Sequence, residues 1–362
     1  IMKKIKVGVL GATGMVGQKY VSLLKNHPWF EIAYIAASQK SAGKTYEEAV
    51  TNRWHMQTDI PDSVRRLRVE DANNVETALN RCSFVFSALE MDKEAIKQLE
   101  IAYAKAGFPV VSNASAHRNT EDVPMLIPEI NANHLAIIPL QQKHYGFNRG
   151  FIVVKPNCSI QSFMIPVDAL RKGGMKVESI DVVTQQALSG AGYPGVPSYD
   201  IVDNRIPFIS GEEEKTEKEP LKIWGYVNTE TGKIVPNRDI LISAQCNRDG
   251  VIDGHTACVK LKFRDTPKLE EVICLWKNYP GFSSLPSAPN PIIIYRSETD
   301  RPQPRLDRDS GNGLAVTVGR LRECATGGIQ FVGLSHNTVR GAAGGGILNA
   351  ELLVSKGYIK QD

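Results

Sequence analysis

IKVGVLGATGMVG, residues 5–17, is the stretch of sequence that decides the fold. Its first six residues have the pattern of a buried strand, and glycines at positions 8, 11, 14 and 17 mark the turn that follows. Apolar residues then repeat at helical spacing, and residues 32–37 have the pattern of a second strand. Residues 5–37 are therefore predicted to form a strand, a turn, a helix and a strand, which is the unit that joins two parallel strands.

The glycine-rich turn has the features of a phosphate-binding loop. Gly11 and Gly14 would let the backbone approach a pyrophosphate, and Gly17 would let the helix pack closely on the strand. The N-terminus of the helix offers free N–H groups and a partial positive charge to an anion. Because the spacing is GxxGxxG rather than GxGxxG, the position between a strand and a helix carries this prediction. The alternative is a tight turn that binds no ligand.

The end of the second strand indicates which dinucleotide is bound. Enzymes that use NAD usually place Asp or Glu here, on the ribose 2′-hydroxyl, and residues 36–44 contain neither. Ser38, Lys40, Ser41 and Lys44 instead offer hydroxyls and positive charge to a 2′-phosphate. We therefore expect NADP rather than NAD. The alternative is an ordinary polar loop, since such residues are common in loops.

Chain length and a change of pattern near residue 150 indicate two domains. At roughly 100–200 residues per domain, 362 residues are more than one domain needs. Short strands near residues 85–88 and 109–112 continue the first pattern, so residues 1–150 are predicted to form a doubly wound, Rossmann-type α/β domain. A last helical pattern begins near residue 340 and could pack back on this domain.

Residues 151–340 are predicted to form an α+β domain with a mixed or antiparallel sheet, one face of which is closed by a partner. The charged run at residues 211–219 is interpreted as the solvated face of a helix. The proline-rich segment 280–304 is interpreted as a loop. The expected strands are residues 178–188, 239–247, 255–263, 314–321 and 330–336, and the expected helices are residues 160–171 and 268–277.

Composition excludes several classes of protein. Lys and Arg number 43 against 39 Asp and Glu, and the resulting charge of +4 is dispersed and does not favour nucleic-acid binding. No apolar run approaches the ~20 residues of a membrane span. The six cysteines form no CxxC pair, so we expect no bound metal. Their low density suggests free thiols in a reducing compartment, and a cytoplasmic location is expected.

Cys158 is the candidate nucleophile. FIVVKPNCSI, residues 151–160, has the pattern of a strand, a break and the start of a helix, which would put the thiol at a helix N-terminus. There the helix dipole would lower the pKa of the thiol and favour the reactive thiolate. A lone cysteine is otherwise more often a small core residue, and the other five cysteines are interpreted as structural.

A thiolate nucleophile needs an acid–base partner, and His255 is the strongest candidate among seven histidines. Glycines at 250 and 254 mark a turn, so Arg248 and His255 are expected to face one another across a hairpin. An imidazole and a guanidinium beside one pocket suit a substrate that carries a carboxylate. His117 and His336 are weaker candidates, and a purely structural His255 is the alternative.

These candidate residues belong to a series of motifs that is spread over nearly the whole chain. In their order along the chain they resemble the aspartate-β-semialdehyde dehydrogenase family, in its archaeal and fungal branch. The motifs are GATGMVG at 11–17, residues 38–44, SNAS at 112–115 with Arg118, PNCS at 156–159, QALSG at 186–190, GEEEK at 211–215, residues 248–255 and HNTVRG at 336–341.

The resemblance implies a reaction. In this family, L-aspartyl-4-phosphate is reduced by NADPH to L-aspartate 4-semialdehyde with release of phosphate, in lysine, threonine and methionine biosynthesis. Cys158 would attack the acyl phosphate and form a thioester, which hydride from the nicotinamide would convert to the aldehyde. His255 would act as the general acid–base, and backbone N–H groups could stabilise the oxyanion.

The resemblance also assigns roles to residues. Asn157 and Gln186 would orient the substrate, and Arg248 would bind its α-carboxylate. Arg118 and Lys215 would bind the phosphate, and Glu212 would face the amine, with Glu213 and Glu214 as alternatives. NADP(H) would be bound by Gly11, Ala12, Thr13, Gly14, Met15, Val16, Ser38, Lys40, Ser41, Ser87, Ser189, Gly190 and Asn337, where Lys40 stands at a position that is often arginine in relatives. Residues 341–362 would complete the first domain, and subunits would form a homodimer or homotetramer through the second.

Other reductases of similar design are the nearest alternatives. The sequence NCS at 157–159 argues against an N-acetyl-glutamyl-phosphate reductase, and the missing carboxylate after the second strand argues against a glyceraldehyde-3-phosphate dehydrogenase. A malonyl-CoA reductase of the same fold remains an alternative, because CoA and phosphate substrates are both anionic. A non-catalytic NADP sensor would be expected to have lost at least one of Cys158, His255, Arg248 and Gln186, and a cysteine hydrolase leaves the glycine turn unexplained.

Overall fold

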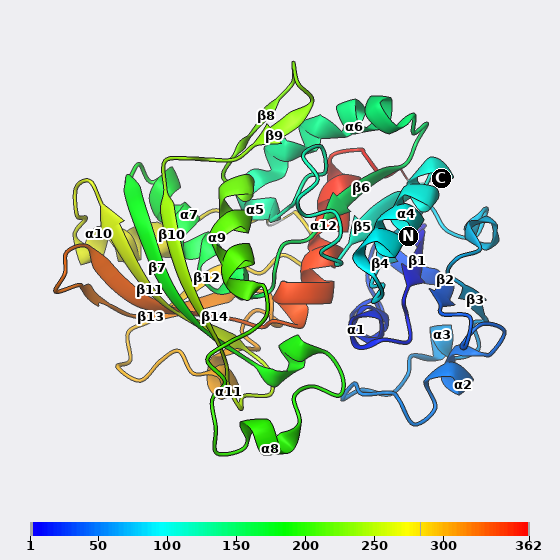
Figure 1. Ribbon diagram of the computed structural model, residues 1–362, viewed down its shortest axis with the longest axis horizontal. Helices are drawn as coiled ribbons and strands as arrows, with labels where there is room; N and C mark the ends of the chain where they lie inside the picture. The colour runs from blue at the N-terminus through cyan, green and yellow to red at the C-terminus, as the bar shows by residue number, and fades with distance from the viewer. Residues whose placement is uncertain (1–2, 283, 361–362) are drawn as a thin grey trace.

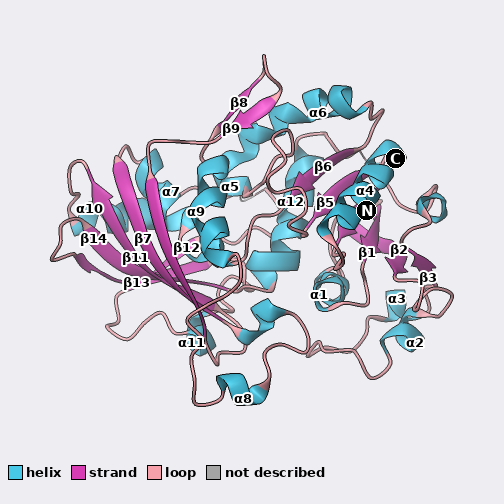
Figure 2. Ribbon diagram, in the orientation of Figure 1, coloured by secondary structure: helices cyan, strands magenta, loops and turns pink. Residues whose placement is uncertain are grey.

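The computed structural model describes residues 3–282 and 284–360, which form two six-stranded sheets side by side (Figure 1). Helices surround the first sheet, whereas the second sheet has longer strands and fewer helices (Figure 2). The outer ends of the expected first domain, residues 1–2 and 361–362, lie outside the described residues.

The first sheet is parallel throughout, and its strand order is β3-β2-β1-β4-β5-β6. This is the order of a doubly wound dinucleotide-binding sheet, so the predicted fold of the first half is confirmed. The strands are β1 (Ile5–Leu10), β2 (Phe30–Ala37), β3 (Val69–Asp71), β4 (Phe84–Ser87), β5 (Pro109–Ser112) and β6 (Phe151–Val154).

Two helices of the first half have clear caps at one end. The carboxylate of Asp92 accepts the N–H groups of Glu94 and Ala95 and so caps α4, and Gly146, at φ +67°, ends α6. The helices are α1 (Met15–Leu23), α2 (Tyr46–Val50), α3 (Asp62–Arg65), α4 (Lys93–Lys105), α5 (Pro128–Asn131) and α6 (Ile138–Tyr145), with 3₁₀ turns η1 (Val75–Ala78) and η2 (Ala132–Ile137).

The C-terminal helix α12 (Gly344–Ser355) packs against the first sheet (Figure 1). Its apolar residues, Ile347 and Leu352 among them, are buried in one cluster with residues of β1, β4 and β5. The division of the chain into two domains stays a proposal, but its first boundary must move. β6 is hydrogen-bonded to β5, so the first sheet extends to Val154 and not only to residue 150.

The second sheet is mixed, as predicted, with order β10-β7-β11-β14-β13-β12. β7 pairs parallel with β10 and antiparallel with β11, and β13 pairs antiparallel with β14 and parallel with β12. Its strands are β7 (Val177–Gln186), β10 (Leu241–Arg248), β11 (His255–Phe263), β12 (Ile293–Arg296), β13 (Val316–Glu323) and β14 (Ile329–Ser335), beside a small hairpin of β8 (Tyr226–Asn228) and β9 (Lys233–Val235).

Helices cover one face of the second sheet. Trp276 packs edge-on against Phe331 of β14, and its indole N–H donates to the carbonyl of Pro166 at 3.0 Å, which joins α10 to α7. The helices and turns of this half are η3 (Ser159–Ser162), α7 (Met164–Lys172), η4 (Leu188–Ala191), α8 (Ser198–Ile201), α9 (Glu212–Ile223), α10 (Leu269–Lys277), α11 (Pro304–Asp307) and the π-helical turn η5 (Val339–Ala343).

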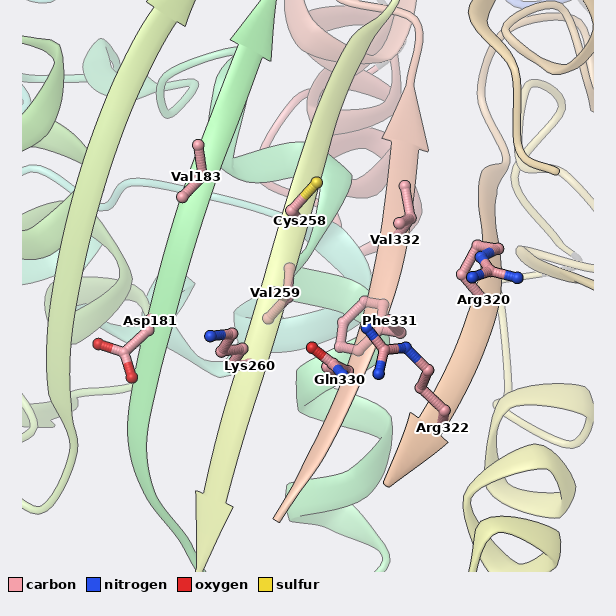
Figure 3. A pocket seen from close by; sticks show the side chains of 10 residues that line it. All are labelled: Asp181, Val183, Cys258, Val259, Lys260, Arg320, Arg322, Gln330, Phe331 and Val332. Atoms are coloured by element: carbon pink, nitrogen blue, oxygen red, sulfur yellow. The ribbon is translucent and has the colours of Figure 1, made fainter. Parts of the chain in front are cut away.

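The opposite face of the second sheet carries a shallow hollow of about 260 Å³. Figure 3 shows the side chains that line it, among them Val183, Cys258 and Arg322, along β7, β11, β13 and β14. None of the predicted site residues lines this hollow. That a partner subunit covers this face stays a prediction.

Two local predictions in the second half were wrong. The segment 280–304 contains β12, because the apolar residues Ile293 and Ile294 pair with β13 despite the surrounding prolines. β10 and β11 do not form a hairpin. β7 lies between them in the sheet, and residues 249–254 cross its end.

Candidate active site

The candidate site residues gather at one edge of the first sheet. Parallel strands end on the same side, so the segments that leave β1, β2, β4, β5 and β6 meet there. Gly11 follows β1, Ser38 follows β2, Ser87 ends β4, and Cys158 follows β6 by four residues. The loops are tied together, since the N–H of Asn113 donates to Ser87 and the N–H of Lys155 donates to Ser112.

The glycine turn is packed too closely against its own backbone to accept a side chain at two of its positions. Gly11 has φ +74°, and a Cβ there would lie 2.3 Å from the carbonyl oxygen of Ala88. A Cβ on Gly17 would lie 2.2 Å from the carbonyl oxygen of Gly11. Gly14 is the N-cap of α1 and has no side chain to bond the first helical N–H groups. The residues from Gly11 to Val16 therefore fit a dinucleotide phosphate at a helix N-terminus.

The other predicted cofactor residues differ in their exposure to solvent. Ser38 and Lys40 are exposed and Ser41 is buried. The Ser87 hydroxyl is buried beside the Glu100 carboxyl, whose pKa it helps to lower against the raising effect of burial.

Ser189 and Asn337 belong to one hydrogen-bond network beside His255. The Asn337 amide donates to the Ser189 hydroxyl at 2.8 Å and accepts the N–H of Gly254 at 2.8 Å. The Ser189 hydroxyl donates to Asp253 at 2.7 Å. The network fixes the turn that precedes His255 and holds it against η4.

Cys158 and His255, 97 residues apart in the chain, are in contact. Sγ of Cys158 lies 3.3 Å from Nε2 of His255. The N–H of Ala187 donates to Nδ1 of the same ring at 3.0 Å, so the neutral imidazole carries its proton on Nε2, facing the sulfur. The pair has the spacing of a nucleophile and its acid–base partner.

The electrostatics of this pair differ from the prediction. Cys158 precedes a four-residue 3₁₀ turn, η3, rather than a long helix, so the expected dipole is small. Burial, followed by the charge of Glu212, raises the pKa of the Cys158 thiol, and the charges of Lys155, Arg118 and Arg248 oppose this shift. Burial and the nearby charge of Arg248 hold the pKa of His255 well below its ordinary value.

Arg248 lies next to His255 although no hairpin joins them. β7 and β10 end at the same edge where β11 begins, which brings Gln186, Arg248 and His255 together. Arg248 is buried and donates from Nη1 to the carbonyl of Ala187 at 2.6 Å, and no carboxylate pairs with it in the described chain. A Cβ on Gly190 would lie 2.8 Å from His255 Cε1 and 2.9 Å from Arg248 Nη1.

Asn157 is held between two glutamates of α9. Its amide nitrogen donates to both oxygens of Glu212, at 3.0 and 2.9 Å, and its backbone N–H donates to Glu219 at 2.6 Å. Lys215 and Gln186 also donate to Glu212, at 2.8 and 3.3 Å. Burial raises the pKa of the Glu212 carboxyl, but these hydrogen bonds outweigh burial and lower it. Of the three consecutive glutamates, the structure places Glu212 against the other site residues.

The charged run at 211–219 is not simply solvated, which corrects the interpretation from sequence. Glu212, Thr216, Glu219 and Lys222 share one face of α9 and are buried. Arg118 donates from Nη1 to Glu219 at 3.0 Å, and Lys222 donates to the carbonyl of Arg118 at 2.8 Å. The spacing of i, i+4, i+7 and i+10 could have revealed this face.

Lys155 is a second group that sequence reasoning missed. It follows the four buried residues of β6 directly, is 2 % exposed, and donates to the carbonyl of Pro156 at 2.6 Å. Burial, followed by the charge of Arg118, lowers the pKa of Lys155 to about 7. Its position at the end of an apolar strand was the available signal.

The weaker histidine candidates each lie near a carboxylate, and His336 also acts electrostatically on His255. His117 is buried, with Nε2 3.9 Å from a carboxylate oxygen of Glu100, and His336 lies 3.6 Å from Asp309. The described part of the chain brings no three His, Cys, Asp or Glu side chains into a metal-binding arrangement. Among residues 3–282 and 284–360, no helix combines the length and apolar character that crossing a bilayer requires.

Two family models match the chain, one in each half. Residues 6–138 match the semialdehyde dehydrogenase NAD-binding domain, and residues 168–340 match the semialdehyde dehydrogenase dimerisation domain. The first match covers the glycine turn, and the second covers Gln186, Arg248 and His255.

Curated relatives that match over nearly the whole chain are named aspartate-semialdehyde dehydrogenase. The aspartate-semialdehyde dehydrogenases of Archaeoglobus fulgidus and Aspergillus fumigatus are 46% and 45% identical, over 98% of this chain and 100% and 99% of theirs. A crystal structure of aspartate semialdehyde dehydrogenase with NADP from Candida albicans superposes with a TM-score of 0.89 at 40% identity, covering 99% of this chain and 100% of that one. The chain therefore belongs to the aspartate-semialdehyde dehydrogenase family.

Proposed function

We propose that this chain is an NADP-dependent enzyme that reduces L-aspartyl-4-phosphate to L-aspartate 4-semialdehyde and phosphate. The observation that carries the proposal is the 3.3 Å contact between Cys158 Sγ and His255 Nε2 beside the buried guanidinium of Arg248. A thiol, a proton donor and a carboxylate receptor stand together at the edge of the sheet where the phosphate turn lies. Membership of the family supports the choice of reaction.

The first half holds the residues for the cofactor. The turn from Gly11 to Val16 would bind the pyrophosphate, and Ser38, Lys40 and Ser41 would meet the 2′-phosphate of NADP. Ser87, Ser189, Gly190 and Asn337 would complete the site. When bound, the dinucleotide supplies the hydride for the reduction.

The chain's own groups would bind and orient the acyl phosphate. Arg248 would hold the α-carboxylate, which suits a buried guanidinium with no carboxylate partner in the described chain. Glu212 would face the amine while it keeps Asn157 and Gln186 in place. Arg118 and Lys215 would receive the phosphate.

Cys158 and His255 would carry the covalent chemistry. After the Cys158 thiol has lost its proton to solvent, the thiolate Sγ attacks the acyl carbon, the bond from carbon to the phosphate oxygen breaks, and a thioester and free phosphate result. Nε2–H of His255 faces this centre and would donate a hydrogen bond to the oxygen that becomes negative at the hemithioacetal stage. When the bond from carbon to Sγ then breaks, the aldehyde and the thiolate are released, and the ring keeps its proton throughout.

The test is an assay in the oxidative direction. Purified protein is mixed with L-aspartate 4-semialdehyde, phosphate and NADP, and the absorbance of NADPH is followed. Phosphate-dependent NADPH formation is expected. The relatives do not favour a malonyl-CoA reductase; a chain that ignores the semialdehyde and instead oxidises NADPH with malonyl-CoA would overturn the proposal.

We also propose that the enzyme works as a homodimer or homotetramer in a reducing compartment such as the cytoplasm. The match of residues 168–340 to a dimerisation domain supports assembly through the second sheet. All six cysteines are free thiols, which suits a reducing compartment. Light scattering on the purified protein measures the assembly, and a monomer would contradict it.

A further inference from the structure

Helix α9 faces the candidate site with a row of polar side chains that are buried. Glu212, Thr216, Glu219 and Lys222 lie on one side of this helix. Glu212 holds the Asn157 side chain, and Thr216 lies 3.4 Å from the Ser159 hydroxyl. The first two residues of the row therefore contact the loop that carries Cys158.

Glu219 contacts two different loops at once. One carboxylate oxygen accepts Nη1 of Arg118 at 3.0 Å, and the other accepts the backbone N–H of Asn157 at 2.6 Å. Glu219 is 4 % exposed, so water cannot replace either partner at low cost. The arginine assigned to phosphate and the backbone next to the nucleophile are thus joined through one side chain.

Two hydrogen bonds hold Arg118, and a third nitrogen of its guanidinium is buried without a partner among the described residues. Nη1 is bound by Glu219 and Nη2 donates to the carbonyl of Asn113 at 3.2 Å. Nε is buried and has no partner among the described residues. Because these contacts already fix the guanidinium, an anion that binds it does not have to order the Arg118 side chain first. Arg118 is therefore a preorganised donor for an anion.

The Glu219 carboxylate also places a negative charge near cationic side chains. Besides Arg118, its carboxylate acts electrostatically on Lys222 and on Lys155, which are both buried. Lys222 fixes the same loop by donating to the carbonyls of Arg118 and Thr120, at 2.8 and 2.7 Å. Removing the Glu219 charge would leave the repulsion between Arg118 and Lys155 without this compensation.

We propose that Glu219 is a positioning residue. By binding both Arg118 and the Asn157 backbone, it holds the Arg118 phosphate contact at a fixed position relative to the Cys158 thiol. The inference rests on the proposed function, since it takes Arg118 as the phosphate contact. Glu219 itself does not touch the reacting atoms. Its effect should therefore fall on phosphate and on the thiol loop, not on NADP.

The chain provides a matched control for a simpler explanation, namely that Glu219 only docks α9. Glu217, on the same helix, accepts the backbone N–H of Ala244 at 3.1 Å and contacts none of the proposed site residues. Glu217→Gln removes a carboxylate from a helix–strand contact of the same kind. If docking alone mattered, the two glutamine variants would behave alike.

The experiment compares Glu219→Gln, Glu219→Asp and Glu217→Gln in the full-length protein. A carboxamide has one accepting and one donating end, so glutamine can keep only one of the two partners of Glu219. We expect the KM for phosphate to rise about 10-fold or more and kcat to fall, with the KM for NADP within about 2-fold. Aspartate keeps the charge and both acceptors and should recover part of the loss.

A second readout needs no turnover. Iodoacetamide alkylation of Cys158 is followed by mass spectrometry of its peptide, with inorganic phosphate added as protectant. In Glu219→Gln the half-protecting phosphate concentration should rise about 10-fold, and in Glu217→Gln it should not change. Equal values in the two variants would overturn the role of Glu219 and leave the proposed function intact. A wild-type protein with neither phosphate protection nor turnover of the semialdehyde would overturn both.

Discussion

Nε2 of His255 lies 3.3 Å from Sγ of Cys158, while Nδ1 of the same ring accepts the N–H of Ala187 at 3.0 Å. A second proton on this ring would set Nδ1–H against the Ala187 N–H, and both burial and Arg248 disfavour the charged ring as well. The imidazole is therefore neutral and donates from Nε2. This geometry suits a hydrogen bond to a substrate oxygen that becomes negative beside the thiol.

Cys158→Ala should abolish turnover and leave NADP binding within about 3-fold of wild type. The sulfur forms the proposed thioester, and the loss of the nucleophile cannot be replaced by His255 alone. The glycine turn that binds the dinucleotide lies on another loop, between β1 and α1. Steady-state assays and NADP titration by fluorescence measure the two effects. Retained turnover in this variant would refute the thioester route.

The reactivity of Cys158 should depend on pH in a direction that the surrounding charges set. Burial and the charge of Glu212 raise the pKa of the thiol, so its alkylation should still be increasing at a pH where an exposed cysteine has levelled off. Glu212→Gln removes a negative charge and should move the profile to lower pH. Lys155→Met should change the profile little, because burial lowers the pKa of Lys155 to about 7 and its amine is neutral in the alkaline range where the thiol titrates. A profile that is the same in all three proteins would contradict this account.

Arg248→Ala should raise the KM for the semialdehyde by about 10- to 100-fold and leave the KM for NADP nearly unchanged. The guanidinium is buried and is held in place by the Ala187 carbonyl, so it is ready to receive a carboxylate. Arg248→Lys should recover only part of the loss, because an ammonium cannot pair bidentately. If the substitutions weaken NADP binding instead, the assigned role is wrong.

The sequence alone predicted those strands and helices whose pattern lies within one short stretch of the chain. The alternation from strand to glycine turn to helix predicted β1, α1 and β2, because each residue's preference and the final fold agree. Cys158 and His255 were identified separately, from Pro-Asn before one and a glycine turn before the other. The structure adds that the Cys158 thiol and the His255 ring are in contact.

What the sequence did not reveal depends on contacts between distant segments. The hairpin of β10 and β11 was the simplest connection, but β7, from some 70 residues earlier, takes the place between them. Glu219 was interpreted as part of a solvated charged run and Lys155 was passed over. The spacing along α9 and the apolar strand before Lys155 indicate burial, but they do not identify the Arg118 guanidinium or the Pro156 carbonyl as the partner. Burial of a charge is decided by its partner, and the partner is remote in sequence.

Glu100→Gln should make stability less dependent on pH. The Glu100 carboxyl is fully buried on α4, accepts the Ser112 hydroxyl at 2.6 Å, and burial raises its pKa to about 7. A raised pKa means that the stability it provides is present below the unfolded value, near pH 4, and is lost as pH rises through 7. The difference amounts to about 3 kcal/mol above pH 7. Thermal unfolding midpoints between pH 5 and pH 8 measure it.

The control for this prediction is Glu94→Gln, which changes an exposed glutamate of the same helix. His117, near Glu100, does not confuse the result, because burial lowers its pKa to about 4 and it stays neutral across the range. Glu100→Gln should exceed the wild-type midpoint at pH 8 and approach it at pH 5. Parallel pH curves for wild type and Glu100→Gln would show that the buried carboxyl does not titrate there.

Gly190→Ala should lower kcat/KM for the semialdehyde about 100-fold while the protein stays folded. The new Cβ would lie 2.8 Å from His255 Cε1 and 2.9 Å from Arg248 Nη1, closer than carbon contacts allow, and both side chains are buried and cannot move aside freely. The matched control is Gly250→Ala on the turn before His255, where the nearest atom to a new Cβ is the Ile201 carbonyl oxygen at 3.8 Å. Circular dichroism checks the fold of both variants. If Gly190→Ala keeps the activity of Gly250→Ala, the placement of the His255 and Arg248 side chains about Gly190 does not control the reaction.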